Sequence, residues 1–275
     1  MSFTPQKKRR LRVKKLVLVL VAIYVMIGAG LYLLQEKMLF LPTVLPQEHM
    51  YSFDHPFEEV YLFPDDGASL NGIHFKVESP KGVILYFHGN AGDLQRWGEI
   101  TEYFVKLNYD VLVMDYRGYG KSTGKRSESA FYSDGQLFYN YLLQRYSEED
   151  ITVYGRSLGS GVATKMTATN APKQLILESP YYSIADVAKH RFPMFPVKSL
   201  LTYRFPNYEN LMDIACPTFI LHGTDDYVVP FSSGEKLSKI SSKSEVHLIP
   251  ILNGGHNDLV DFESYHKGIR SILEE

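Results

Sequence analysis

The chain has 275 residues, of which 45% are hydrophobic and 13% aromatic, so it can bury a sizeable core and is not a disordered protein. Its formal net charge of −2 conceals an asymmetry, because residues 1–15 carry seven basic side chains and no acidic one. A single cysteine, Cys216, excludes an intramolecular disulfide framework and a multi-cysteine metal site. No H-E-x-x-H motif occurs either, so the sequence implies no metal and no cofactor.

The run LVLVLVAIYVMIGAGLYLL at residues 16–34 contains no charged side chain. As a helix it would be close to the ~30 Å hydrocarbon thickness of a bilayer. A cleaved secretory signal is the alternative, since residues 28–30 are small enough for a peptidase site. The run continues past them, however, and is longer than the apolar region of most such signals. We therefore predict a basic tip at 1–15 and a transmembrane signal anchor at 16–35.

The basic tip also predicts the topology of this anchor. Basic residues favour the cytoplasmic side, so the amino terminus is expected in the cytoplasm and the rest of the chain outside it, in the periplasm or an equivalent space. A basic segment can also bind nucleic acid, but beside a transmembrane run it is better explained by topology or by anionic lipid. We thus expect a single-pass membrane protein without a nucleic-acid partner; its oligomeric state is left open.

The proline-interrupted residues 36–56 are typical of a connector, and residues 57–275 predict one domain. EEVYLF and IHFKVE predict an antiparallel hairpin. Continuous apolar runs, typical of parallel strands covered on both faces, follow in GVILYFHG, DVLVMDYRG, ITVYG, QLILES, TFILHG and EVHLIPI. Helix-length segments lie at 94–107, 129–146, 158–169, 232–240 and 258–273. This order predicts a doubly wound α/β fold, with a mostly parallel, eight-stranded sheet between helix layers.

Ligands bind beyond the carboxyl ends of the strands in such a sheet, and YGRSLGSG at 154–161 lies at one of these ends. The G-x-S-x-G pattern alone is weak evidence, because serine is also a common helix cap. Here a strand leads directly into a helix, with Ser157 at the corner and glycines two residues to either side. Such a turn exposes the hydroxyl, so we predict that Ser157 is a nucleophile.

A serine nucleophile needs a base, and the base needs a carboxylate that orients it. In this kind of fold the expected chain order is Ser, then Asp or Glu, then His. We predict Asp226 as the acid, from HGTDDYVVP at a strand end, ahead of its neighbour Asp225 and of Glu178. We predict His256 as the base, because it follows two glycines on a loop after the last strand.

The acyl-transfer intermediate requires backbone N–H donors for its oxyanion. Leu158, directly after the serine, is one predicted donor. The second lies in YFHGNAGD, after the first parallel strand, where we favour Asn90 over Ala91. His88 and His222, which both precede glycine at strand ends, are expected to brace turns.

Together these motifs resemble the α/β-hydrolase superfamily, and more narrowly the membrane-anchored bud-emergence-type hydrolases. The latter are related to serine aminopeptidase-like enzymes and to protein-depalmitoylating α/β-hydrolase-domain enzymes. The resemblance rests on QEKMLFLP, HGNAGD, DYRGYGKSTG, YGRSLGSG, ESPYYS, HGTDDYVVP and GGHND, which together extend over nearly the whole chain. It implies an α/β-hydrolase fold with Ser157, Asp226 and His256 as the catalytic triad. Depalmitoylating relatives are usually attached by lipidated cysteines, which this amino terminus lacks.

An aromatic segment at about 181–214, between the sixth and seventh strands of the sheet, predicts a small lid. An apolar lid near a bilayer suits an acyl or lipid-like substrate, although the same aromatic residues could simply fill a helical cap. The leading hypothesis is a membrane-anchored serine hydrolase that cleaves carboxylic esters or thioesters through an acyl-enzyme. The alternatives are an aminopeptidase-like peptidase and a catalytically silent, membrane-tethered binding protein.

Overall fold

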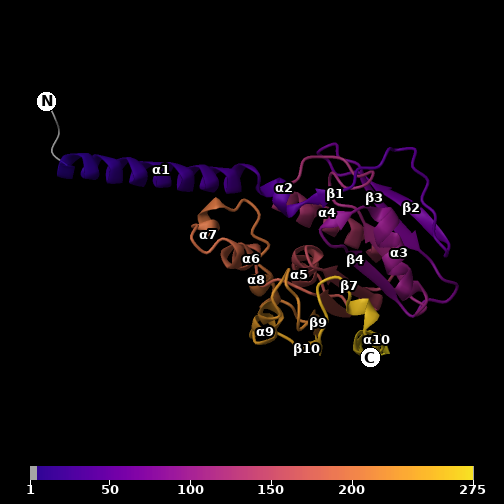
Figure 1. The fold of residues 1–275 in the computed structure, drawn as a ribbon. Helices are drawn as coiled ribbons and strands as arrows, with labels where there is room; N and C mark the ends of the chain where they lie inside the picture. The colour runs from indigo at the N-terminus through magenta and orange to yellow at the C-terminus, as the bar shows by residue number, and fades with distance from the viewer. Residues whose placement is uncertain (1–4, 275) are drawn as a thin grey trace.

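The structure is a computed structural model that describes residues 5–274, with side chains from residue 9 onward. The first four residues of the predicted basic tip and the last residue of the predicted domain lie outside this range. A long amino-terminal helix extends away from a layered α/β domain (Figure 1).

This helix, α1, covers Pro5–Leu33. Its part from Arg9 to Leu33 is long and apolar enough to cross a membrane, and its side chains are largely exposed. The predicted amino-terminal apolar helix is therefore confirmed. A turn at Leu34 separates it from a short helix, α2, which covers Gln35–Leu39.

The predicted eight-stranded sheet is also confirmed, with the strand order β10-β9-β8-β7-β4-β6-β3-β2. All neighbouring strands from β10 to β6 are parallel, whereas β3 is antiparallel to both β6 and β2. The strands are β2 (Phe57–Leu62), β3 (Leu70–Phe75), β4 (Val83–Phe87), β6 (Asp110–Met114), β7 (Ile151–Arg156), β8 (Gln174–Glu178), β9 (Thr218–Gly223) and β10 (Val246–Ile251). The central strands are buried along their whole length, which explains their continuous apolar sequences.

Helices cover both faces of the sheet. Trp97 and Phe104 of α3 pack in one core cluster with Ile269 of α10, whereas Phe138 of α4 and Val162 of α5 belong to the cluster on the other face. The helices are α3 (Leu94–Val105), α4 (Glu128–Leu143), α5 (Gly159–Thr169), α9 (Ser232–Ser238) and α10 (Glu263–Glu274), with 3-10 turns η1 (Glu148–Asp150) and η2 (Leu259–Asp261).

The helix predicted at 258–273 begins five residues later than expected, at Glu263. Asp258, the first residue of the predicted segment, instead accepts a hydrogen bond from the N–H of Gly255 at 2.6 Å. Its carboxylate therefore closes the loop that carries His256, and the following residues form η2 before the helix starts.

Three short helices between β8 and β9 occupy the predicted lid segment: α6 (Ile184–Arg191), α7 (Val197–Leu200) and α8 (Asn207–Leu211). The segment after α1 packs against both the lid and the loop that follows β4. Gln35 bonds to the backbone of Leu200 and Thr202, at 3.2 and 2.8 Å. The two-residue strand β1 (Leu41–Pro42) pairs with β5 (Ala91–Gly92), directly after Asn90. This pairing fixes the loop in which the second oxyanion donor is expected.

Candidate active site

Ser157 lies at the sharp corner between β7 and α5, with a φ of 48° that places a non-glycine residue in the left-handed region. Such a conformation costs roughly 1–3 kcal/mol and persists only where the surrounding structure enforces it. A Cβ atom at Gly155 would lie 2.5 Å from the Cβ of Ala163, and one at Gly159 would lie 2.0 Å from the carbonyl oxygen of Phe87. The two glycines therefore let strand and helix approach closely enough to hold the serine in this turn.

The structure brings Ser157, His256 and Asp226 into one hydrogen-bonded line. The Nε2 atom of His256 lies 2.9 Å from the Oγ of Ser157, and its Nδ1 atom lies 2.7 Å from Oδ2 of Asp226. A neutral imidazole that donates from Nδ1 to the carboxylate has Nε2 free to accept the serine proton. This is the geometry that a nucleophile, base and orienting acid require.

The carboxylate of Asp226 is buried and held from several sides. Its Oδ1 accepts hydrogen bonds from the N–H groups of Val228 and Val229, each at 2.8 Å, while Oδ2 faces His222 and His256. Burial alone would raise the pKa of Asp226, but the hydrogen bonds from the two imidazoles and the backbone hold that pKa well below its ordinary range. Asp226 therefore stays ionised beside His256, whereas the neighbouring Asp225 is exposed.

The other polar residues considered from the sequence have further partners of their own, and His222 also lies 3.4 Å from Asp226. Glu178 is paired with Arg156, whose Nε lies 3.0 Å away, and it also accepts a bond from Tyr154, so its carboxylate is engaged away from His256. His88 bonds through Nδ1 to the carbonyl of Gly89 at 2.7 Å, and His222 bonds through Nε2 to the carbonyl of Val229 at 2.9 Å. Both histidines brace turns at strand ends.

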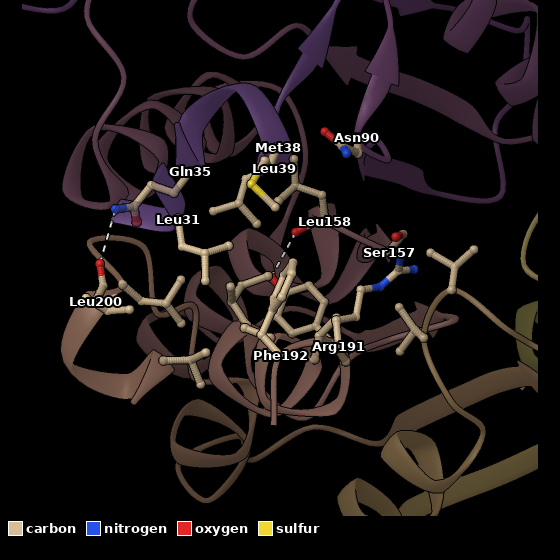
Figure 2. Close-up of a pocket in the computed structure, with 18 residues that line it drawn as sticks. Leu31, Gln35, Met38, Leu39, Asn90, Ser157, Leu158, Arg191, Phe192 and Leu200 are labelled. Atoms are coloured by element: carbon tan, nitrogen blue, oxygen red, sulfur yellow. Dashed lines mark hydrogen bonds between the residues drawn. The ribbon is translucent and has the colours of Figure 1, made fainter. Parts of the chain in front are cut away.

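The two favoured oxyanion donors, Asn90 and Leu158, line the same cavity as Ser157 (Figure 2). Within residues 5–274, the backbone N–H groups of Asn90 and Leu158 have no hydrogen-bond acceptor. Tyr119 donates to the carbonyl of Asn90 at 2.7 Å, which holds the Asn90–Ala91 peptide directly after the proposed donor. Ala91, the alternative donor, lies in β5. Two unpaired donors beside a serine hydroxyl can stabilise a developing oxyanion.

A cavity of about 340 Å³ extends from Ser157 toward the amino-terminal helix. Apolar side chains of the lid and of the amino-terminal segment form most of its wall, with Gln35 and Arg191 among the polar ones. The lining residues are Leu31, Gln35, Met38, Leu39, Asn90, Ser157, Leu158, Tyr181, Ile184, Val187, Ala188, Arg191, Phe192, Val197, Leu200, Leu201, Val228 and Val229. Sequence reasoning did not identify the contributions of Leu31 or of α2.

Arg191 is the one charged side chain among the described residues that line this cavity. It comes from the end of α6, and Figure 2 shows it extending toward Ser157. The basic residues at the end of α6 were visible in the sequence, but no motif indicates that one of them turns toward the serine. A guanidinium in this position can bind an anionic group close to the reacting bond.

Comparisons with known proteins find similar hydrolases. A family profile described as "Serine aminopeptidase, S33" matches residues 78–210. The lysophosphatidylserine lipase ABHD12 of Danio rerio is 31% identical over an alignment that covers 92% of this chain and 78% of that protein. An uncharacterized protein of Mycobacterium tuberculosis is 28% identical over an alignment that covers 93% of this chain and 94% of that protein.

Solved structures share the fold at low sequence identity. An esterase of Pyrococcus furiosus matches with a TM-score of 0.66 and 19% identity, over 86% of this chain and 97% of that one. An acetyl xylan esterase of a Paenibacillus species matches with a TM-score of 0.63 and 16% identity, over 82% and 87% of the two chains. The similarity to the Danio rerio protein over most of both sequences, together with this shared fold, shows that the chain belongs to the α/β-hydrolase superfamily, among its ABHD-type members.

Proposed function

We propose that this chain is a membrane-anchored serine hydrolase that cleaves the carboxylic ester, or the corresponding thioester, of a lipid-like acyl substrate. The observation that carries the proposal is the hydrogen-bonded line of Ser157, His256 and Asp226 at one end of an apolar cavity. In this assignment Ser157 is the nucleophile, His256 the general base and Asp226 the orienting acid.

The distances support a two-step mechanism. His256 Nε2 takes the proton of Ser157 as Oγ attacks the substrate carbonyl, and the ionised Asp226 stabilises the imidazolium that forms. The N–H groups of Asn90 and Leu158 bind the oxyanion, and each such donor is typically worth about 10²- to 10³-fold in turnover. His256 then protonates the leaving alcohol or thiol. Water attacks the acyl-enzyme by the same route and releases the fatty acid.

The cavity wall supports a particular substrate class, the single-chain anionic lipids. Its apolar side chains suit an acyl chain, and Arg191 beside Ser157 suits a phosphate or carboxylate near the ester. The similar protein from Danio rerio is named a lysophosphatidylserine lipase, which is an enzyme for a substrate of this kind. We therefore propose lysophospholipids, and not triacylglycerols, as the substrates to test first.

The matched family profile also raises an aminopeptidase as a second candidate. An aminopeptidase must bind the protonated amino terminus of its substrate, which usually calls for a carboxylate. The charged lining residue in the described part of the chain is a cation, Arg191, which would repel an ammonium group. We consequently favour the ester over the peptide bond.

Membrane attachment is part of the proposal. The helix Arg9–Leu33 and its basic start support a single-pass anchor with a cytoplasmic amino terminus, which puts the catalytic domain on the opposite side. Protease protection of a carboxyl-terminal tag in sealed vesicles tests this orientation. In vesicles whose cytoplasmic face points outward, the tag should be digested only after the vesicles are opened, and its digestion in intact vesicles would contradict the proposed orientation.

The reaction is tested with p-nitrophenyl esters of increasing chain length, lysophosphatidylserine and aminoacyl p-nitroanilides, all with the full chain in detergent. We expect hydrolysis of the esters, with medium or long chains preferred over acetate, and no release of p-nitroaniline. Preference for the aminoacyl amides would favour the peptidase. A lack of preference for longer chains over acetate would contradict an acyl-lipid substrate.

A further inference from the structure

The loop between α6 and α7, residues 192–196, contacts the amino-terminal helix. The ring of Phe195 stacks on that of Tyr24, with centroids 4.6 Å apart and planes at 6°. The hydroxyl of Tyr24 donates to the carbonyl of Met194 at 2.9 Å, and Gly28 faces the same Phe195 ring. Figure 1 shows α7 lying alongside α1 at this point. The lid is thus docked on the helix proposed to span the membrane.

The position of this contact along α1 matters. Tyr24 lies near the middle of the uncharged run 16–34, ten residues before its end. At ~1.5 Å per residue this is about 15 Å along the helix axis, which is half the thickness of the hydrocarbon core. A segment that touches α1 at Tyr24 therefore lies at the depth of the acyl chains, not in the surrounding water.

The composition of the lid loop fits this depth. Residues 192–196, FPMFP, form an uncharged run, and Met194 is 80% exposed. Exposed lysines flank the run, Lys189 on one side and Lys198 on the other. An apolar tip between lysines that can extend toward lipid headgroups is typical of segments inserted into one leaflet.

The cavity connects this tip to the serine. Leu31 of α1 and Leu200 of α7 line its end away from Ser157, and Phe192 of the loop lines the wall between them (Figure 2). We propose that residues 192–196 insert into the membrane leaflet beside α1, so that the cavity receives an acyl chain directly from the bilayer. The partner of this surface is the lipid leaflet. The proposal rests on the anchoring and ester hydrolysis proposed above.

Insertion is measured by fluorescence, independently of activity. The full chain is reconstituted in phosphatidylcholine vesicles whose acyl chains carry bromine, which quenches nearby tryptophan. Met194→Trp adds a reporter at the tip, and Phe63→Trp adds one directly after β2, the edge strand far from α1 in Figure 1. The native Trp97 is buried and supplies the same background in both variants.

We expect the added emission of Met194→Trp to fall at least twofold in brominated vesicles, and that of Phe63→Trp to stay unchanged. Equal emission of Met194→Trp in brominated and ordinary vesicles would overturn the insertion. Quenching of both reporters would also overturn it, because lipid would then contact the domain at both sites and not specifically at residues 192–196.

A kinetic test with Met194→Asp separates this proposal from the proposed function. We expect hydrolysis of long-chain lysophosphatidylserine in vesicles to fall about tenfold, with hydrolysis of soluble p-nitrophenyl butyrate unchanged. Equal loss on both substrates, or no loss on either, would contradict uptake from the leaflet while ester hydrolysis stands. If the parent protein cleaves neither ester, the proposed function fails, and the fluorescence result still decides the insertion.

Discussion

The two ends of the cavity are built in different ways. At one end, Ser157 and Asp226 follow the buried strands β7 and β9, His256 follows the edge strand β10, and hydrogen bonds hold the three side chains together. The other end is formed by side chains of the amino-terminal segment and the lid, which touch through aromatic stacking and a few bonds to backbone carbonyls.

This difference separates chemistry from selection. The sheet end has the parts that any ester hydrolysis needs, and similar parts can serve many substrates on one fold. In the proposed function, the lid end selects which acyl chain and which headgroup reach the serine. Mutations at the sheet end should therefore reduce the rate for every substrate, whereas mutations at the lid end should change the ratio between substrates.

The largest expected effect is at the sheet end. Asp226→Asn keeps the size of the side chain but removes the charge that orients His256, so kcat should fall about 10⁴-fold for all esters. The matched control is Asp225→Asn, because this neighbour is exposed, and we expect activity within twofold of the parent. Steady-state kinetics on p-nitrophenyl butyrate measures both. A larger loss of activity in Asp225→Asn than in Asp226→Asn would show that Asp226 is not the orienting acid.

At the lid end, Arg191→Gln should reduce hydrolysis of an anionic lipid without reducing hydrolysis of a neutral one. Charge-assisted hydrogen bonds contribute about 1.5–3 kcal/mol, so kcat/KM for lysophosphatidylserine should fall about ten- to a hundredfold. Hydrolysis of a neutral monoacylglycerol should not change, and Arg191→Lys should restore part of the loss. An equal decrease for the charged and neutral lipids would show that Arg191 does not select the headgroup.

A smaller effect is expected where the anchor lines the cavity. Leu31→Trp should occupy space used by the end of a long acyl chain, and each methylene excluded from burial costs about 0.8 kcal/mol. We expect the preferred chain length to shorten, with several-fold lower kcat/KM for long chains and unchanged values for butyrate. Leu33→Trp is the control on the same helix, since Leu33 is 74% exposed and does not line the cavity. Identical chain-length preferences in Leu31→Trp and Leu33→Trp would show that Leu31 of α1 does not contact the acyl chain.

The smallest effect concerns stability and pH. The pKa of Asp226 is lower in the folded state than in the unfolded state, where it is about 3.9. The ionised side chain therefore stabilises the fold above the unfolded-state value, and this contribution is lost as the pH falls through the lower folded-state pKa. The Tm of the parent minus that of Asp226→Asn should accordingly decrease below about pH 4. A difference that grows with acidification would contradict the depressed pKa.

The sequence predicted much more of the sheet end than of the lid end. Continuous apolar runs indicated the parallel strands, and G-x-S-x-G, HGTDD and GGHND indicated which side chains would meet, because the carboxyl ends of parallel strands share one edge. These signals are local, and the fold follows from their order. The structure adds that Asp226 is the buried member of its aspartate pair, which the sequence had favoured without excluding Asp225.

The lid end could not be predicted in this way. The contribution of Leu31 and α2 to the cavity depends on how the amino-terminal segment packs on a loop about 170 positions later. A hydrophobic pattern within one segment does not indicate which distant segment it contacts. The direction of Arg191 depends on where α6 ends, which is a property of the folded lid. The late start of α10 follows from the hydrogen bond between Asp258 and Gly255, whereas the sequence predicted a helix from residue 258.

The central claim is that Ser157 is the nucleophile, and labelling with a fluorophosphonate probe tests it most directly. The probe is added to the full chain in its membrane, and the modified peptide is identified by mass spectrometry. Lys165→Ala, two turns further along α5, is the control for substitution in the same helix. We predict one label on Ser157, retained in Lys165→Ala and absent in Ser157→Ala. An unlabelled parent protein, or a label that survives in Ser157→Ala, would contradict the account.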